Sequence, residues 1–261
     1  MTRWLTRPVA TLVSTVLLGA TVVGGCSAGL SVDDGAAGRP LLVGDECADL
    51  VVFGARGSMQ DPRPNLGVGT EVRAAIEQLA RRLHARSDTT LHVEAIGYDS
   101  SATPTAAEFL RHTADGSSMA LDHLTSRAAQ CPDSRFALLG FSQGAHVVHT
   151  AAMSVPVALA SRVVLVGMIA DPTTNPGDTI TRWSYADHPT PGHGRLGAGP
   201  AIPPVLRHAA ISFCVAGDAI CNDRGAPGDG QSPTHKHFYE KTSTARITAT
   251  QLDLVLQRNG V

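Results

Sequence analysis

The chain has 261 residues, of which 43% are hydrophobic and 17% are charged, enough for one large α/β domain or two small ones. Its 21 Lys and Arg residues nearly balance its 23 Asp and Glu residues, and the net charge of -2 argues against a nucleic-acid-binding protein, which needs a basic surface. Aromatic residues make up only 4% of the chain, which argues against a surface that stacks on sugars or on unpaired bases.

Residues 1–25 have the pattern of an export signal. Arg3 and Arg7 supply positive charge at the start, and the uncharged stretch that follows is too short and too rich in Gly and Thr for a membrane span. The stretch leads into VGGC at residues 23–26, which resembles the lipobox of bacterial lipoproteins. We therefore predict a signal peptide and lipidation of Cys26, which would attach the exported protein to the cell membrane. An ordinary secretory signal with an incidental Cys is the alternative.

The segment after the signal predicts a tether followed by one domain. Residues 26–44 are rich in Gly, Ala, Ser and Asp and show no hydrophobic period, which is typical of a flexible linker. No repeat and no internal linker interrupts the rest of the chain. We therefore expect residues 45–261 to form a single domain.

Apolar runs alternate with helical periodicities along this domain. The expected strands cover residues 50–53, 92–98, 136–139, 163–169 and 211–213. The expected helices lie around residues 71–86, 121–130, 143–153 and 252–256. Residues 172–204, rich in Gly, Pro and His, are expected to form a surface loop. This alternation predicts the α/β class, with a central, mostly parallel five-stranded sheet and helices on both faces.

The cysteines of an exported chain enter an oxidising compartment, where disulfides form. Apart from Cys26, four cysteines remain, which is enough for two disulfides with three alternative connectivities. The short spacing favours a Cys214–Cys221 pair, which leaves Cys47 to pair with Cys131. Because no C-x-x-C pair is present, we expect no metal site.

Residues 140–144, Gly-Phe-Ser-Gln-Gly, match the pattern G-x-S-x-G. The pattern lies between an apolar strand and a helix of small residues, which is where an α/β-hydrolase has its nucleophile elbow. Ser142 is therefore the predicted nucleophile, and the backbone N–H of Gln143 is the first predicted donor of an oxyanion hole. The alternative is a glycine turn with an incidental serine.

A serine hydrolase of this type also needs an acid and a base, which follow the nucleophile in that order along the chain. Asp171, directly after the fourth predicted strand, and Asp218, within the predicted disulfide loop, are both candidate acids. A loop closed by a disulfide would hold a carboxylate in a fixed position. Of the 11 histidines, only His235 and His237 follow Asp218, so one of these two is the expected base.

Three segments, spaced along the chain, together resemble the motifs of one protein family. They are the elbow at residues 140–144, the segment CADLVVFGARGS at residues 47–58, and the segment CVAGDAIC at residues 214–221. Together they resemble the elbow, the first strand with its following loop, and the acid-bearing disulfide loop of the cutinase family, in particular of actinobacterial cutinase-like esterases. The elbow departs from the usual family sequence, because Phe141 stands where a Tyr is usual. The resemblance implies a single-domain α/β-hydrolase fold.

The resemblance also implies roles for the candidate residues. It selects Asp218 as the acid and makes the turn at Asp171 structural. It favours His235 over His237 as the base, because Phe238 completes the family's His-x-x-aromatic pattern. His237 is the alternative base if the pattern is read as His-x-Tyr, ending at Tyr239.

By the same resemblance, Ser58 is the second donor of the oxyanion hole beside Gln143. The implied activity is hydrolysis of short- to medium-chain carboxylic esters through an acyl-enzyme, without a cofactor or metal. We expect a monomer that is anchored through Cys26 or freely secreted, with an ester or lipid as its substrate and no nucleic-acid partner. The alternatives are a non-enzymatic surface lipoprotein that binds a lipid or cell-wall component, and an acetyl-xylan esterase or thioesterase with the same chemistry.

Overall fold

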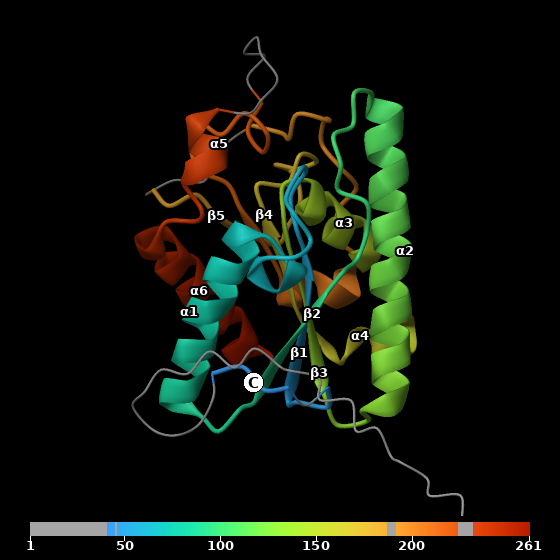
Figure 1. The fold of residues 1–261 in the computed structure, drawn as a ribbon, viewed down its shortest axis with the longest axis vertical. Coiled ribbons are helices and arrows are strands. Elements are labelled where there is room, and N and C mark those ends of the chain that lie inside the picture. Colours follow the sequence, from blue (N-terminus) through green and yellow to red (C-terminus); the bar gives the residue numbers. More distant parts are fainter. Residues whose placement is uncertain (1–40, 45, 187–191, 224–231) are drawn as a thin grey trace, which may run out of the picture.

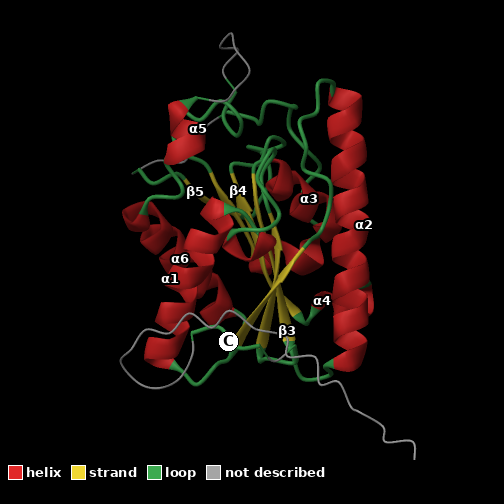
Figure 2. Cartoon of the chain, in the orientation of Figure 1, coloured by secondary structure: helices red, strands yellow, loops and turns green. Residues whose placement is uncertain are grey.

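A six-stranded parallel sheet forms the centre of the computed structural model, which describes residues 41–44, 46–186, 192–223 and 232–261 (Figure 2). The strands are β1 (Leu50–Ala55), β2 (Leu91–Ala95), β3 (Arg135–Phe141), β4 (Val163–Ile169), β5 (Thr181–Trp183) and β6 (Ala210–Phe213). They lie side by side in the order β2-β1-β3-β4-β6-β5, and every neighbouring pair is parallel. The predicted signal peptide, Cys26 and most of the predicted tether lie outside the described residues.

Both faces of this sheet are covered by helices (Figure 1). On one face α1 (Thr70–Arg86) packs against α6 (Thr242–Arg258), and on the other α2 (Ala106–Gln130) packs against α3 (Gln143–Ala152). The short elements are α4 (Val157–Ala160), α5 (Pro233–His237) and the 3-10 turns η1 (Asn65–Gly67) and η2 (Pro204–Ala209). None of the described helices is both long and apolar enough to cross a membrane.

The central strands are continuous apolar runs because both of their faces are buried. Successive side chains of β1 point to opposite sides, so Leu50 and Val52 join the core cluster beneath α1 and α6, whereas Val51 and Phe53 join the cluster beneath α2 and α3. The predicted α/β class, with helices on both faces of a parallel sheet, is confirmed.

Three details of the fold differ most from the sequence-based expectation. The sheet has six strands rather than five, because β5 lies within residues 172–204, which were expected to form a loop. A three-residue, half-buried strand at the sheet edge has no apolar run that could reveal it. The folded part also begins before residue 45, because Leu41 and Leu42 are buried in the core.

The third difference is the length of α2, which begins at Ala106 rather than near residue 121. The inward face of its first half consists of small and polar residues, so the helical period of apolar residues is absent there. Gly116 illustrates why small residues are needed, since a Cβ atom at this position would lie 2.9 Å from Tyr98 and Val147. The N-terminus is nevertheless marked by Thr105, whose hydroxyl accepts the N–H of Glu108.

The described residues contain two disulfides, Cys47–Cys131 and Cys214–Cys221. The first joins the segment before β1 to the end of α2, and the second closes the loop after β6. These are the two pairs that the spacing of the cysteines favours.

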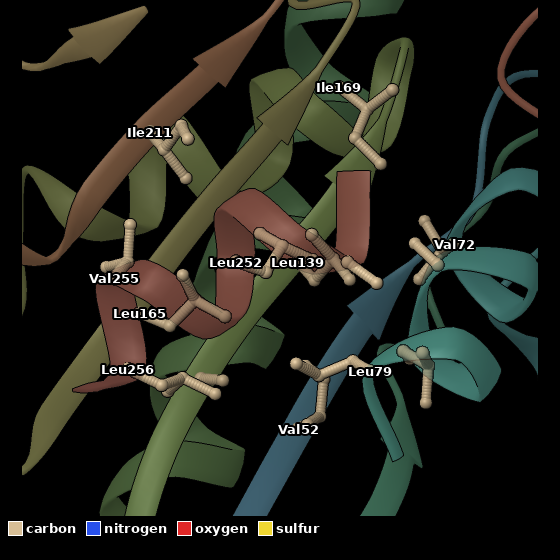
Figure 3. Packing of buried hydrophobic residues seen from close by; sticks show 14 of the residues in the cluster. Val52, Val72, Leu79, Leu139, Leu165, Ile169, Ile211, Leu252, Val255 and Leu256 are labelled. Atoms are coloured by element: carbon tan, nitrogen blue, oxygen red, sulfur yellow. The ribbon is translucent and has the colours of Figure 1, made fainter. Parts of the chain in front are cut away.

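The core between α6 and the sheet is closely packed (Figure 3). A Cβ atom at Gly167 of β4 would lie 2.5 Å from Cδ1 of Leu139 and 3.1 Å from Cδ2 of Leu252. The missing side chain at Gly167 therefore gives Leu139 of β3 and Leu252 of α6 the space in which they pack.

This packing makes α6 sensitive to truncation at Leu252. Replacing Leu252 with Ala leaves a cavity and should lower the free energy of unfolding by about 2–5 kcal/mol. Leu254, on the same helix, is 44% exposed, so Leu254→Ala should cost less than about 1 kcal/mol. Urea denaturation of both variants provides the comparison. Equal losses of stability would contradict this description of the core.

Candidate active site

Ser142 lies in a sharp turn between the end of β3 and the start of α3. Its φ of 54° and ψ of -117° are strained for a residue with a side chain. The glycines on either side make the turn feasible: a Cβ atom at Gly140 would lie 2.1 Å from the carbonyl oxygen of Gly144, and one at Gly144 would lie 2.1 Å from that of Ala55. The G-x-S-x-G pattern thus folds here as a strand–turn–helix elbow that no bulkier sequence could form.

The elbow shares one edge of the sheet with the loop that follows β1. β1 and β3 are neighbours, with Ala55 paired to Gly140, and β2 lies on the opposite side of β1. Strand order therefore reverses at β1 and β3, and ligands of open α/β sheets bind in the crevice at such a point. Ser58, which follows β1, lines one pocket of about 540 Å³ together with Ser142 and His235.

The imidazole of His235 connects the hydroxyl of Ser142 to the carboxylate of Asp218. Its Nε2 lies 3.0 Å from Oγ of Ser142, and its Nδ1 lies 3.1 and 3.0 Å from Oδ1 and Oδ2 of Asp218. All three side chains are buried, and Asp218 has no exposed surface. A proton on Nδ1, directed at the carboxylate, leaves the lone pair of Nε2 free to accept the serine proton. This arrangement can activate a serine hydroxyl as a nucleophile.

Local structure holds His235 in this position. His235 lies on α5, beyond the upper end of the strands in Figure 1, and its N–H donates to the hydroxyl of Ser232 at the start of that helix. The ring of Phe141 stacks on the imidazole with a centroid distance of 4.9 Å and an angle of 21° between the planes. Phe141, the residue at which the elbow departs from the usual family sequence, therefore fixes the plane of the imidazole.

The other candidate base lies elsewhere on the same segment. The side chain of His237 is 66% exposed, and its Nδ1 lies 3.0 Å from Oε1 of Glu240. Of the two histidines, the structure brings His235 to Ser142 and directs His237 to solvent.

The two candidate acids have different histidine partners. Asp218 lies in the Cys214–Cys221 loop, where Oδ1 also accepts the N–H of Ile220 at 2.9 Å. Asp171 follows β4, and its Oδ2 lies 2.6 Å from Nδ1 of His149 on α3. The structure thus joins Asp218, and not Asp171, to the histidine beside Ser142.

A polar network holds the loop that carries Ser58. The guanidinium of Arg56 is buried and donates to the carbonyl oxygens of Ile96 and Tyr98 and to the hydroxyl of Ser100. These contacts fasten the start of the loop to the segment after β2.

The far side of the same loop is held by Gln60. Its Oε1 accepts the N–H of Gly57 at 2.7 Å, and its Nε2 donates to the carboxyl of Glu71 at 2.6 Å. Burial raises the pKa of this carboxyl. With the loop held at both sides, Ser58 lines the same pocket as Ser142. The N–H of Gln143 has no acceptor within α3, because Gln143 is in the first turn of that helix. Such N–H groups can stabilise an oxyanion.

The wall of the pocket is mainly apolar. Met59, Phe109, Leu196 and Ile220 come from four separate segments of the chain, and Met59 and Leu196 are exposed apolar side chains. A wall of this kind suits the hydrocarbon part of a substrate. Within the described ranges, no group of His, Cys, Asp and Glu side chains is arranged to hold a metal ion.

Tyr239 had no predicted role beyond ending the alternative His-x-Tyr pattern, although its hydroxyl donates to Oδ2 of Asp218 at 2.9 Å. The one local signal was a second aromatic residue after Phe238. Nothing in the sequence indicates that this side chain reaches the disulfide loop.

Comparisons with known proteins agree with this fold. A family model described as Cutinase matches residues 46–251, and the chain belongs to the cutinase family. The chain is 28% identical over 212 residues to carboxylesterase Culp1 of Mycobacterium tuberculosis, and the aligned region covers 80% of this chain and 84% of that protein. The chain is also 27% identical over 212 residues to a cutinase of Kineococcus radiotolerans, and the aligned region covers 78% of this chain and 61% of that protein.

Among solved structures, an acetylxylan esterase at 0.90 Å resolution shares the fold, with a TM-score of 0.63, 19% identity, and coverage of 82% of this chain and 100% of that chain. The family and the curated relatives together show that the protein is a carboxylic ester hydrolase. They do not support the alternative of a non-enzymatic lipoprotein.

A second buried acid–histidine pair joins the elbow helix to the segment after β4. Asp171 accepts from Nδ1 of His149, while Nε2 of His149 lies 2.9 Å from the carbonyl oxygen of Pro200. Because a carboxylate and a carbonyl only accept, both ring nitrogens must carry protons. Burial opposes the positive charge, but the hydrogen bond and charge of Asp171 outweigh it and raise the pKa of His149, and the same contact lowers the pKa of Asp171 despite its burial.

A histidine with a raised pKa stabilises the fold fully below its ordinary value of 6.5, and this contribution is lost as the pH rises through the raised pKa. His149→Gln should therefore reduce the free energy of unfolding more at about pH 5.5 than at about pH 9. His237→Gln, at an exposed position, should change it little at either pH. Urea titrations at the two pH values test this, and a loss for His149→Gln that does not depend on pH would contradict the charged pair.

Proposed function

We propose that the protein is an exported serine esterase with Ser142 as the nucleophile, His235 as the base and Asp218 as the acid. The observation that carries the proposal is the continuous path from hydroxyl to imidazole to buried carboxylate, at the edge of the sheet where β1 and β3 end. Membership of the cutinase family supports an ester as the substrate.

The reaction begins when Oγ of Ser142 attacks the ester carbonyl while Nε2 of His235 takes the hydroxyl proton. Asp218 keeps Nδ1–H in place and stabilises the imidazolium that forms. The backbone N–H groups of Gln143 and Ser58 stabilise the negative carbonyl oxygen of the tetrahedral intermediate. The tetrahedral intermediate then collapses. The bond between the carbonyl carbon and the leaving oxygen breaks as the imidazolium protonates that oxygen, the alcohol leaves, and the acyl group stays on Ser142 as an ester.

The second half of the reaction regenerates the enzyme. His235 takes a proton from water, which attacks the acyl-enzyme through a second tetrahedral intermediate. The carbon–oxygen bond to Ser142 breaks, the serine regains a proton from His235, and the carboxylic acid leaves. His235 accepts or donates the proton in every proton transfer of this scheme.

The pocket supports short- to medium-chain acyl groups as substrates. Its volume is about 540 Å³, and Phe109, Leu196 and Ile220 contribute apolar surface next to Ser142 and His235. We propose that residues 1–25 are removed as a signal peptide and that Cys26 is lipidated. The folded domain then acts as a monomer at the end of a tether that ends before Leu41.

Ser142→Ala should abolish hydrolysis of p-nitrophenyl esters, with a loss of at least about 10³-fold in kcat, because the acyl-enzyme can no longer form. The wild type should hydrolyse the butyrate faster than the palmitate. Ser118→Ala, at an exposed serine of α2, should retain full activity. Full activity in Ser142→Ala would overturn the proposal, and a preference for palmitate would overturn the short-chain assignment alone.

The base and the acid are tested by two matched pairs in the same assay. His235→Asn should be nearly inactive, whereas His237→Asn should resemble the wild type. Asp218→Asn should be severely impaired, whereas Asp171→Asn should retain activity in proportion to the folded fraction measured by circular dichroism. The reverse order in either pair would reassign that role.

A further inference from the structure

The hydroxyl of Tyr239 lies against the carboxylate that orients the base. It donates to Oδ2 of Asp218 at 2.9 Å and accepts the backbone N–H of Val215 at 3.1 Å. The side chain is 2% exposed. Because its lone pair is occupied by Val215, the hydroxyl proton is directed at Asp218. Both partners belong to the Cys214–Cys221 loop region, so Tyr239 connects the start of the loop to its acid.

The contacts of Asp218 show what Tyr239 adds. Oδ1 accepts from the N–H of Ile220 and faces Nδ1 of His235, and Oδ2 accepts from Tyr239 and faces the same nitrogen. If the phenol were removed, Oδ2 would lose its hydrogen bond from Tyr239, and of the partners named here only the imidazole of His235 would still face it. The carboxylate has no exposed surface, so water cannot readily replace the lost donor.

We propose that Tyr239 is a positioning residue of the esterase, which sets the orientation of the Asp218 carboxylate and shares its negative charge. The proposal rests on the proposed triad. His235 and Tyr239 belong to one short segment, so the base and this donor reach the carboxylate together. A shared charge keeps the imidazolium from being held too tightly by Asp218, and a fixed carboxylate keeps Nε2 directed at Ser142.

The surroundings of Tyr239 keep this donor in place. Burial, and next the negative charge of Asp218, hold the pKa of Tyr239 well above its ordinary value, so the phenol keeps its proton. The rings of Phe141, Phe238 and Tyr185 lie 5.8, 5.3 and 5.9 Å from its ring. These aromatic contacts remain in Tyr239→Phe, which removes only the hydroxyl.

Tyr185→Phe is the matched control for this change. Tyr185 belongs to the same aromatic cluster, and its hydroxyl lies 2.7 Å from Oγ1 of Thr248 on α6. Removing that hydroxyl deletes a hydrogen bond of the same chemical kind that does not involve Asp218.

The test measures kcat and KM against pH for p-nitrophenyl butyrate. In Tyr239→Phe, kcat should fall by about 10-fold with KM nearly unchanged, because the base is less well oriented. The acid limb of the kcat/KM profile should move up by about half a pH unit, because a carboxylate with one donor fewer holds the imidazolium more strongly. Tyr185→Phe should keep the wild-type acid limb.

A second variant keeps the test decisive even if Tyr239→Phe fails to fold. Tyr239→3-fluorotyrosine keeps the hydroxyl but makes it a stronger donor, so the acid limb should move down rather than up. An acid limb that stays at the wild-type position in both Tyr239 variants would overturn the positioning role. If Ser142→Ala is inactive in the same assay, that outcome leaves the triad intact, whereas activity in Ser142→Ala would overturn the proposed function itself.

Discussion

The close crossing of α3 over the ends of β1 and β3 is the constraint on which the site depends. Gly144 lies so near the carbonyl oxygen of Ala55 that no Cβ atom fits between them, and Gly140 lies equally near Gly144. This contact forces Ser142 into its strained turn and places the start of α3 beside the loop after β1. Since β1 and β3 are paired neighbours, Ser142 and the loop that carries Ser58 keep a fixed relation through the sheet.

The second requirement is that the buried carboxylate of Asp218 have hydrogen-bond partners. A carboxylate with no exposed surface is costly to bury unless hydrogen bonds surround it, and Asp218 has contacts from Ile220, His235 and Tyr239. The disulfide at Cys214–Cys221 closes the loop that presents these groups. One short loop and one short helix, α5, thus hold Asp218 and His235 together beside the elbow.

The features that local sequence could predict are those with a local cause. The apolar runs at Leu50 and Val163 and the glycines around Ser142 predict strands and an elbow, because burial and close approach leave direct marks on residue type. β5 escaped prediction because a short edge strand buries too little apolar surface to leave such a mark. The choice of His235 over His237 needed the family resemblance, since both follow Asp218 and only the turn of α5 separates their directions. Tyr239 had no predicted contact with Asp218, because an aromatic residue after Phe238 does not show that its hydroxyl reaches a carboxylate 21 residues earlier.

We propose that Ser142 is a nucleophile that is activated within the folded, oxidised protein. The most direct test is mass spectrometry after incubation with a p-nitrophenyl alkylphosphonate, which transfers a phosphonyl group to an activated serine and releases p-nitrophenol. We expect one adduct per chain, on the peptide that contains Ser142, and much slower labelling in His235→Asn. An adduct on another residue, or no adduct in the folded wild type, would contradict it.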